Sequence, residues 1–127
     1  MGKTLIVDDE EDMRLLLRLT INRENRGLQV VGEASSGEEA LVIRRELDVD
    51  VIVLDHRMPG LTGIETAKAI LADEPEVPIV LYSAFVDAGM TAEARQAGVR
   101  RCVKKGDVRG LIAALRELTG SDIGGPV

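Results

Sequence analysis

Polar side chains follow four of the five apolar runs that the sequence predicts as strands. In chain order they are Asp8 and Asp9 after the run 5–7, Asp55 after 51–54, Ser83 after 79–82, and Lys104 and Lys105 after 99–103. Because the carboxyl ends of parallel strands meet at one edge of a sheet, we expect these side chains to lie close together. One such residue alone is more typical of a turn or a helix cap, so the prediction depends on the combination.

The three acids indicate a divalent metal ion. Carboxylates crowded together repel one another, and a cation between them removes that repulsion. Hard oxygen ligands without a thiol nearby favour Mg²⁺ or Mn²⁺ over Zn²⁺. His56 follows Asp55 directly, but no second histidine or cysteine shares the predicted site, so we interpret His56 as a loop residue.

The same residues could take part in phosphoryl transfer. With a metal bound, an aspartate carboxylate can attack a phosphoryl group and form an aspartyl phosphate. The charge on the equatorial phosphoryl oxygens must then be neutralised. A metal would do part of this, a lysine from the opposite side would do more, and a hydroxyl such as that of Ser83 would donate a hydrogen bond.

Strand and helix patterns alternate along the chain and predict the elements that position these residues. Short apolar runs predict strands over 5–7, 28–34, 51–54, 79–82 and 99–103, the last being half polar and therefore expected at a sheet edge. Apolar spacing predicts helices over 11–25, from Ser36 with Glu39 completing a capping box, over 64–72, over 92–97 before Gly98, and over 111–118. This alternation predicts an α/β sandwich around a parallel sheet.

The core is expected to be aliphatic, because aromatic residues make up only 2% of the chain. Helical spacing predicts which side chains of the first two helices face that core. They are Met13, Leu16, Leu17 and Ile21 in the first helix and Ala40, Leu41, Ile43 and Leu47 in the second. In the third helix, Ile64, Ala67, Lys68 and Leu71 recur at helical spacing.

The composition is typical of a single soluble domain of the cytoplasm. The 127 residues are expected to form one domain over 1–119 and a turn-rich tail over 120–127. The net charge of −6 disfavours direct nucleic-acid binding, and the longest clean apolar run, 111–115, is too short to span a bilayer. The N-terminus lacks a secretory signal pattern, and the one cysteine, Cys102, cannot form an internal disulfide.

Four segments together resemble the receiver domains of two-component response regulators. The most specific of them is Asp-x-x-Met-Pro-Gly-x-x-Gly over 55–63, which lies downstream of the acidic pair in the segment 5–10, and the segments 80–84 and 102–105 also agree. The resemblance covers about residues 3–118. It implies a doubly wound, flavodoxin-like α/β fold whose five-stranded parallel sheet has the order 2-1-3-4-5 and is flanked by five helices.

The resemblance implies a phosphorylation-dependent signalling switch. Asp55 would accept the phosphoryl group from a sensor histidine kinase or a phosphotransfer protein. Ser83 would be the switch hydroxyl, and Lys105, rather than Lys104, would pair with the phosphate. Such a domain is regulatory and not an enzyme, although it supports its own phosphorylation and dephosphorylation.

The resemblance also implies a set of metal ligands. Asp9 and Asp55 would bind Mg²⁺ or Mn²⁺ directly, together with the backbone carbonyl of Arg57. Asp8 would act mainly through a bound water. Arg57 and Phe85, which lie two positions after the acceptor and the switch hydroxyl, would flank the path of the water that removes the phosphate.

Protein partners are expected on one face. The chain ends soon after the fifth helix, which favours a single-domain receiver that signals by protein contact, without direct nucleic-acid or membrane binding. The face from the fourth helix through the fifth strand to the fifth helix is the family's usual output and dimer surface. Arg100, Arg101 and Arg109 are expected on or near it, and a homodimer is an option.

Two positions depart from the family pattern. Gly106 stands where the family usually has a proline after the lysine, so we expect a more flexible loop there. Cys102 stands where the family commonly has an aromatic residue that swings inward on activation. We expect Cys102 to be a small buried hydrophobe rather than a reactive thiol, and ring rotation is not available to this chain.

Three other functions are alternatives to a phosphorylation switch. An aspartyl-nucleophile phosphohydrolase of the haloacid dehalogenase type needs an acid two residues after the nucleophile, where this chain has Arg57. A flavin-binding domain needs a hydroxyl-rich loop after the first strand, where this chain has four acids over 8–11. A degenerate receiver that acts as an interaction scaffold remains the main alternative, although no acidic, hydroxyl or lysine position is lost.

Overall fold

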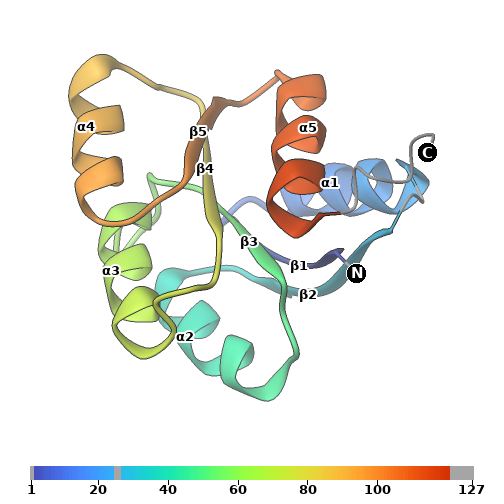
Figure 1. The fold of residues 1–127 in the computed structure, drawn as a ribbon, viewed down its shortest axis with the longest axis horizontal. Coiled ribbons are helices and arrows are strands. Elements are labelled where there is room, and N and C mark those ends of the chain that lie inside the picture. The colour runs from blue at the N-terminus through green and yellow to red at the C-terminus, as the bar shows by residue number, and fades with distance from the viewer. Residues whose placement is uncertain (1, 25–26, 121–127) are drawn as a thin grey trace.

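A parallel sheet forms the centre of the molecule. The structure, a computed structural model, describes residues 2–24 and 27–120. Within these residues five strands form one sheet in the order β2-β1-β3-β4-β5, which confirms the predicted order (Figure 1). The strands are β1 Gly2–Val7, β2 Leu28–Ala34, β3 Val51–Leu54, β4 Ile79–Ser83 and β5 Arg101–Lys104. The order reverses between β1 and β3, which is where sheets of this kind hold their ligands.

Helices cover both faces of the sheet. On one face lie α1 Glu11–Glu24 and α5 Val108–Thr119, and on the other lie α2 Gly37–Glu46, α3 Gly63–Asp73 and α4 Ala88–Gln96 (Figure 1). Each strand is followed by one helix, the arrangement that parallel strands need for their connections. None of the helices in the described ranges is long and apolar enough to cross a membrane.

The central strands are buried on both faces. In β3, Ile52 and Leu54 join the apolar cluster under α2, α3 and α4, whereas Val51 and Val53 join the cluster under α1 and α5. All four side chains are at most 1% exposed. A continuous run of β-branched and aliphatic residues suits such a strand. The tight packing fixes the position of Asp55, which follows β3 directly.

Capping residues set the helix starts, and here the structure differs from the prediction. α4 begins at Ala88 rather than at residue 92 because the Asp87 side chain caps it, accepting a backbone hydrogen bond of 2.8 Å. α5 begins at Val108 rather than at 111 because Asp107 accepts a similar bond of 2.9 Å. The predicted starts followed the first apolar repeat, whereas the cap is polar and lies earlier in the chain.

The capping box lies at α3 rather than at α2. Ser36 caps α2 as predicted and accepts from the Glu39 N–H at 3.0 Å, but the Glu39 carboxylate accepts from the Ser35 N–H instead of closing the box. Before α3, Thr62 accepts from the Glu65 N–H at 3.2 Å, and Glu65 accepts from the Thr62 N–H at 2.9 Å. This box fixes the end of the loop between β3 and α3.

One residue predicted to face the core is exposed instead. Leu16 is 53% exposed, because it lies about 100° around the helix axis from its buried neighbour Leu17. Lys68, which shares the helical spacing of the third helix, is exposed on α3, whereas Thr66, Ala67 and Ile70 are fully buried. The other predicted positions are buried or partly buried: Met13, Leu17, Ile21, Ala40, Leu41, Ile43, Leu47, Ile64, Ala67 and Leu71.

Candidate functional site

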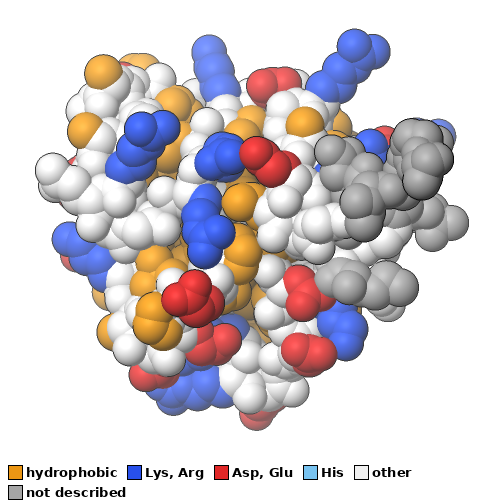
Figure 2. All heavy atoms as spheres, viewed as in Figure 1, with side chains coloured by type: hydrophobic (Ala, Val, Ile, Leu, Met, Phe, Trp, Pro, Cys, Tyr) orange, Lys and Arg blue, Asp and Glu red, His pale blue; other side chains and the backbone are white. Residues whose placement is uncertain are grey.

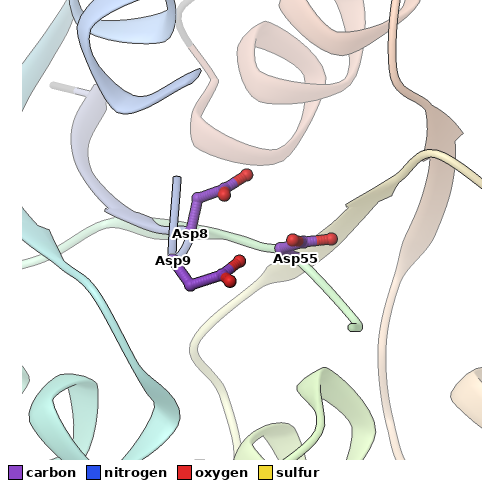
Figure 3. A group of neighbouring side chains, drawn as sticks. All are labelled: Asp8, Asp9 and Asp55. Atoms are coloured by element: carbon purple, nitrogen blue, oxygen red, sulfur yellow. The ribbon is translucent and has the colours of Figure 1, made fainter. Parts of the chain in front are cut away.

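Three aspartates meet where β1 and β3 end. Val7 pairs with Leu54 across these two parallel strands, so the residues that follow leave the sheet side by side. One carboxylate oxygen from each of Asp8, Asp9 and Asp55 lies within 4.8 Å of the others (Figure 3). Asp8 and Asp55 are buried, at 1% and 5% exposure, whereas Asp9 is exposed. The predicted cluster is therefore present, with one member open to solvent.

Backbone hydrogen bonds hold the two buried aspartates. The Asp8 N–H donates to the Ala34 carbonyl at 3.1 Å, and the Asp55 N–H donates to the Val7 carbonyl at 2.9 Å, so both residues extend the strand ladders. The Asp8 Oδ1 accepts from the Glu10 N–H at 2.9 Å. The second carboxylate oxygen of Asp8, Oδ2, faces Lys105 instead.

Lys105 connects the two buried aspartates. Its Nζ lies 2.9 Å from the Asp8 Oδ2, 3.2 Å from the Asp55 Oδ2 and 3.6 Å from the Glu10 Oε1, and its side chain is only 11% exposed. Lys104 is exposed and makes no ion pair within residues 2–24 and 27–120. The structure thus brings Lys105, and not Lys104, to the aspartates.

Burial and charge shift the proton affinities at this cluster. Burial raises the pKa of Asp55 above its ordinary value, and the nearby Asp8 charge raises it further, although Lys105 opposes both. Burial alone would lower the pKa of Lys105. The hydrogen bonds that Lys105 makes with Asp8 and Asp55, together with the charges of these two aspartates, outweigh burial and raise the pKa. The negative charges are therefore only partly balanced by the one ammonium.

The residues present fit a hard divalent cation. Three carboxylates oppose one ammonium, so a net negative charge remains to be neutralised. Asp9 makes no hydrogen bond or ion pair with the described part of the chain, which leaves both of its oxygens available as ligands. Carboxylate oxygens without a thiol or imidazole are the donor set that Mg²⁺ and Mn²⁺ prefer.

His56 and Ser83 have separate local partners. The His56 carbonyl accepts from the Gly63 N–H at 2.8 Å, and its Nδ1 accepts from the Ile64 N–H at 3.4 Å, so His56 ties the loop to the start of α3. Ser83 is buried at the end of β4, and its Oγ accepts a long hydrogen bond of 3.5 Å from the Phe85 N–H. The Ser83 carbonyl accepts from the Lys105 N–H at 2.8 Å, which links the two strand ends.

Arg57 and Phe85 form a pair beside the aspartates. The Arg57 guanidinium lies over the Phe85 ring, 5.4 Å from its centroid, which is a cation–π distance. The Phe85 ring is 59% exposed. Both side chains line a surface hollow of about 270 Å³, which is completed by His56, Thr62, Asp87, Met90 and Glu93.

Sequence reasoning missed the role of Arg14, and it noted Gly106 without the contact that anchors its loop. The Arg14 guanidinium donates to the Asp8 carbonyl at 2.6 Å, and the apolar spacing used to predict the first helix gives no signal for such a contact. The loop after Lys105 is shaped by Gly106, whose φ of 101° is a left-handed conformation that glycine tolerates and proline cannot adopt. The Gly106 N–H donates to the Tyr82 hydroxyl at 3.0 Å, which anchors this loop.

Cys102 is partly rather than fully buried. It packs against the cluster under α2, α3 and α4. Burial raises the pKa of its thiol, although a hydrogen bond from Thr91 and the charge of Arg95 act in the opposite direction. A raised pKa keeps the thiol protonated at neutral pH, so its reactivity is low.

Known proteins resemble this chain in both sequence and structure. The profile of the response regulator receiver domain matches residues 4–116. The response regulator GacA of Pseudomonas aeruginosa is 34% identical over 122 residues, which cover 93% of this chain and 55% of GacA. The chemotaxis protein CheY of Thermotoga maritima is 38% identical over 106 residues, covering 83% of this chain and 87% of CheY.

A solved structure with a similar fold holds a metal ion. The response regulator TrrA of Thermotoga maritima in complex with Mg²⁺-BeF has a TM-score of 0.80 and 28% identity, and the match covers 93% of this chain and 99% of that one. The chain spans about half the length of the GacA proteins that it matches.

Proposed function

This chain belongs to the response regulator receiver domain family and is a phosphorylation-dependent switch of two-component signalling, and we propose that Asp55 is the residue that accepts the phosphoryl group. The observation that carries this proposal is the position of Asp55 between Asp9 and Lys105 at the end of β3. Asp55 is fixed by the sheet, and it is the one member of the acidic cluster that follows β3, whereas Asp8 and Asp9 follow β1.

The chemistry of transfer follows from this arrangement. An Asp55 carboxylate oxygen attacks the phosphorus of a phosphohistidine, the P–N bond breaks, and the histidine nitrogen leaves with the bonding electrons. The Lys105 ammonium, already beside Asp55, pairs with one phosphoryl oxygen, and the Ser83 hydroxyl donates to another. The donor is a sensor histidine kinase or a phosphotransfer protein.

The acidic cluster is proposed to hold Mg²⁺ or Mn²⁺. Asp9, Asp55 and the backbone carbonyl of Arg57 would be direct ligands, and Asp8 would act through a water. When bound, the metal supplies positive charge for the phosphoryl oxygens. The TrrA complex, which contains Mg²⁺-BeF, supports this assignment by similarity.

The domain is regulatory, and we propose that it supports its own phosphorylation from small donors and its own dephosphorylation. It would act in the cytoplasm. The downstream partner, and a second copy in a homodimer, would dock on the face formed by α4, β5 and α5. Figure 2 shows Lys and Arg side chains along this strip of the surface. Arg101 lies on it in an ion pair with Glu117 at 2.8 Å, and Arg100 and Arg109 are exposed nearby.

Intact-mass measurement tests the acceptor. Incubation with acetyl phosphate should add one phosphate to the wild-type chain when Mg²⁺ or Mn²⁺ is present, and none when the metal is removed by chelation. Asp55→Asn should gain no phosphate, because an amide is not a nucleophile of this kind.

A matched control is Asp48→Asn, since the Asp48 side chain is 80% exposed and lies outside the cluster. This variant should be phosphorylated like the wild type. Ordinary phosphorylation of Asp55→Asn would show that another residue is the acceptor. No phosphorylation of the wild type by acetyl phosphate or by a phosphohistidine donor would favour the scaffold alternative.

A further inference from the structure

Arg14 is a partly buried cation that contacts the loop carrying two of the site aspartates. It is the fourth residue of α1, and its side chain is 16% exposed. The Arg14 Nη1 donates to the Asp8 carbonyl at 2.6 Å. A hydrogen bond from a charged donor is about twice as strong as one between neutral groups. The proposed metal site uses the Asp8 side chain, whereas Arg14 contacts the Asp8 backbone carbonyl.

The contact controls the peptide between Asp8 and Asp9. That peptide is planar, and the Asp8 carbonyl and the Asp9 Cα belong to the same plane. Holding the oxygen therefore sets the direction in which Asp9 leaves the strand. Asp9 makes no hydrogen bond or ion pair of its own with the residues that the structure describes, so its position depends on the backbone that precedes it.

A carboxylate on the neighbouring strand orients Arg14. The Glu33 Oε1 lies 3.5 Å from the Arg14 Nε, and the other oxygen of Glu33 pairs with Arg18, one turn further along α1. Arg14 and Arg18 thus share one acidic partner, but of the two it is Arg14 that donates to the Asp8 carbonyl. Arg18 is therefore a natural control for the charge and packing of this region.

We propose that Arg14 is a positioning residue for metal binding: by holding the Asp8–Asp9 peptide, it places the Asp9 carboxylate where it can share a cation with Asp55. The proposal rests on the proposed metal site and adds a residue to it. The positive charge of Arg14 would have the opposite effect on Mg²⁺ affinity, because a guanidinium near a cation site repels the cation. Removal of Arg14 should strengthen Mg²⁺ binding if its charge dominates and weaken it if positioning dominates.

Calorimetric titration of Mg²⁺ into the metal-free protein distinguishes these two effects. Arg14→Met keeps the aliphatic stem and loses the donor, and we expect its Kd for Mg²⁺ to rise about tenfold, as is typical when a partner of a metal ligand is removed. Arg18→Met should stay within about twofold of the wild type, because it removes the same charge without touching the Asp8 carbonyl. Arg14→Lys, which can donate to the same oxygen, should recover part of the affinity.

Two further readouts separate positioning from general loss of structure. In the absence of metal, amide hydrogen exchange at Asp9 and Glu10 should be faster in Arg14→Met than in the wild type and in Arg18→Met. At saturating Mg²⁺, phosphorylation of Arg14→Met by acetyl phosphate should approach the wild-type rate, because Asp55 and Lys105 are unchanged. The Mg²⁺ concentration needed for half-maximal phosphorylation should rise, while the maximal rate of phosphorylation should stay the same.

Failure of this proposal can be told apart from failure of the proposed metal site. Equal or tighter Mg²⁺ binding by a folded Arg14→Met, or equal weakening by Arg18→Met, would overturn the positioning role. If Arg14→Met does not fold, Arg14→Gln carries the same expectation and the same contradicting outcomes. A wild-type chain that binds no Mg²⁺ would instead overturn the metal site itself.

Discussion

Lys105 holds two of the site aspartates before any phosphate arrives. Its ammonium is shared between Asp8 and Asp55, so the unphosphorylated protein already contains a cation directed at the proposed acceptor. A phosphoryl group on Asp55 would present new anionic oxygens to the same ammonium. The lysine would then report the chemical state of Asp55 to the end of β5, and through the Ser83 carbonyl to the end of β4.

The two neighbouring lysines give a test of this coupling. In Lys105→Ala, we expect binding of beryllofluoride, a mimic of the phosphoryl group, to shift the NMR signals of the site but to lose most of the shifts on α4 and β5. In Lys104→Ala, the full wild-type pattern should appear, because Lys104 is exposed and points away from the aspartates. Equal responses of the two variants would show that Lys105 does not couple the site to this face.

The Arg57–Phe85 pair is expected to prolong the phosphorylated state. An aspartyl phosphate on Asp55 would be lost when water attacks in line with the Asp55 oxygen, and we expect these two side chains, which lie against each other, to flank that path. Phe85 offers water no hydrogen bond, and a guanidinium does not act as a base. An amide or a carboxylate at either position could orient the water and speed its attack.

The measurement is the rate of phosphate loss from the purified phosphoprotein. Arg57→Asn and Phe85→Glu should each raise the rate at least about threefold, which corresponds to about 0.65 kcal/mol of barrier. Arg100→Asn, which changes an exposed arginine outside the hollow, is the matched control and should leave the rate unchanged. Wild-type rates in both test variants would show that the pair does not shield the phosphate.

At the scale of the elements, the fold could be predicted because each strand is one clean apolar run. Val51 to Leu54 is apolar on both faces, and Asp55 interrupts it, so the strand and its end are both visible in the sequence. The helix starts were less visible, because the cap is a single polar residue. Asp87 and Asp107 resemble any other exposed aspartate until the chain folds around them.

The residues of the site also divide into those that the sequence predicts and those that it does not. The aspartates and the two lysines Lys104 and Lys105 could be predicted because they follow strands, and sheet topology alone brings strand ends together. The choice of Lys105 over Lys104 comes from the family resemblance. Arg14 could not, because its partner is a backbone carbonyl, which every residue has. Arg44 is a similar case: it is 6% exposed on α2 and pairs with Asp73 and Glu74 at the end of α3, contacts that helical spacing does not reveal.

The capping box of α3 is expected to stabilise the loop that follows Asp55. Thr62→Ala removes the acceptor for the Glu65 N–H, and we expect it to lower the free energy of unfolding by about 1 kcal/mol, measured by urea denaturation. Thr20→Ala is the matched control, since the Thr20 hydroxyl donates within an exposed part of α1. Its effect should stay within about 0.5 kcal/mol, and an equal effect in both variants would contradict a special role for the box.

At the scale of the whole molecule, the acidic cluster lowers the stability of the metal-free fold. The folded-state pKa of Asp55 is raised above its value in the unfolded chain, because the folded state buries its charge beside Asp8. The folded state therefore binds this proton more tightly, and ionisation of Asp55 favours unfolding. The destabilisation is present above the folded pKa and disappears as the pH falls below the unfolded value of 3.8.

Removal of that charge should stabilise the metal-free protein. Without metal at pH 7, we expect Asp55→Asn to have a higher free energy of unfolding than the wild type, and the difference should shrink as the pH is lowered toward 3.8. Asp48→Asn, at an exposed position, should show no such gain. A metal-free Asp55→Asn that is less stable than the wild type at pH 7 would contradict the cause assigned to the pKa shift.

Adding Mg²⁺ should reverse the order of the two proteins. A ligand that binds only the folded state stabilises it, by about 2.7 kcal/mol when its concentration is 100 times Kd. The wild type should gain most of this, because all three carboxylates can share the cation and their mutual repulsion is removed. Asp55→Asn lacks one ligand and should gain much less. Thermal unfolding with chelator and with saturating Mg²⁺ measures both differences, and equal gains would show that Asp55 is not a metal ligand, whatever its role as acceptor.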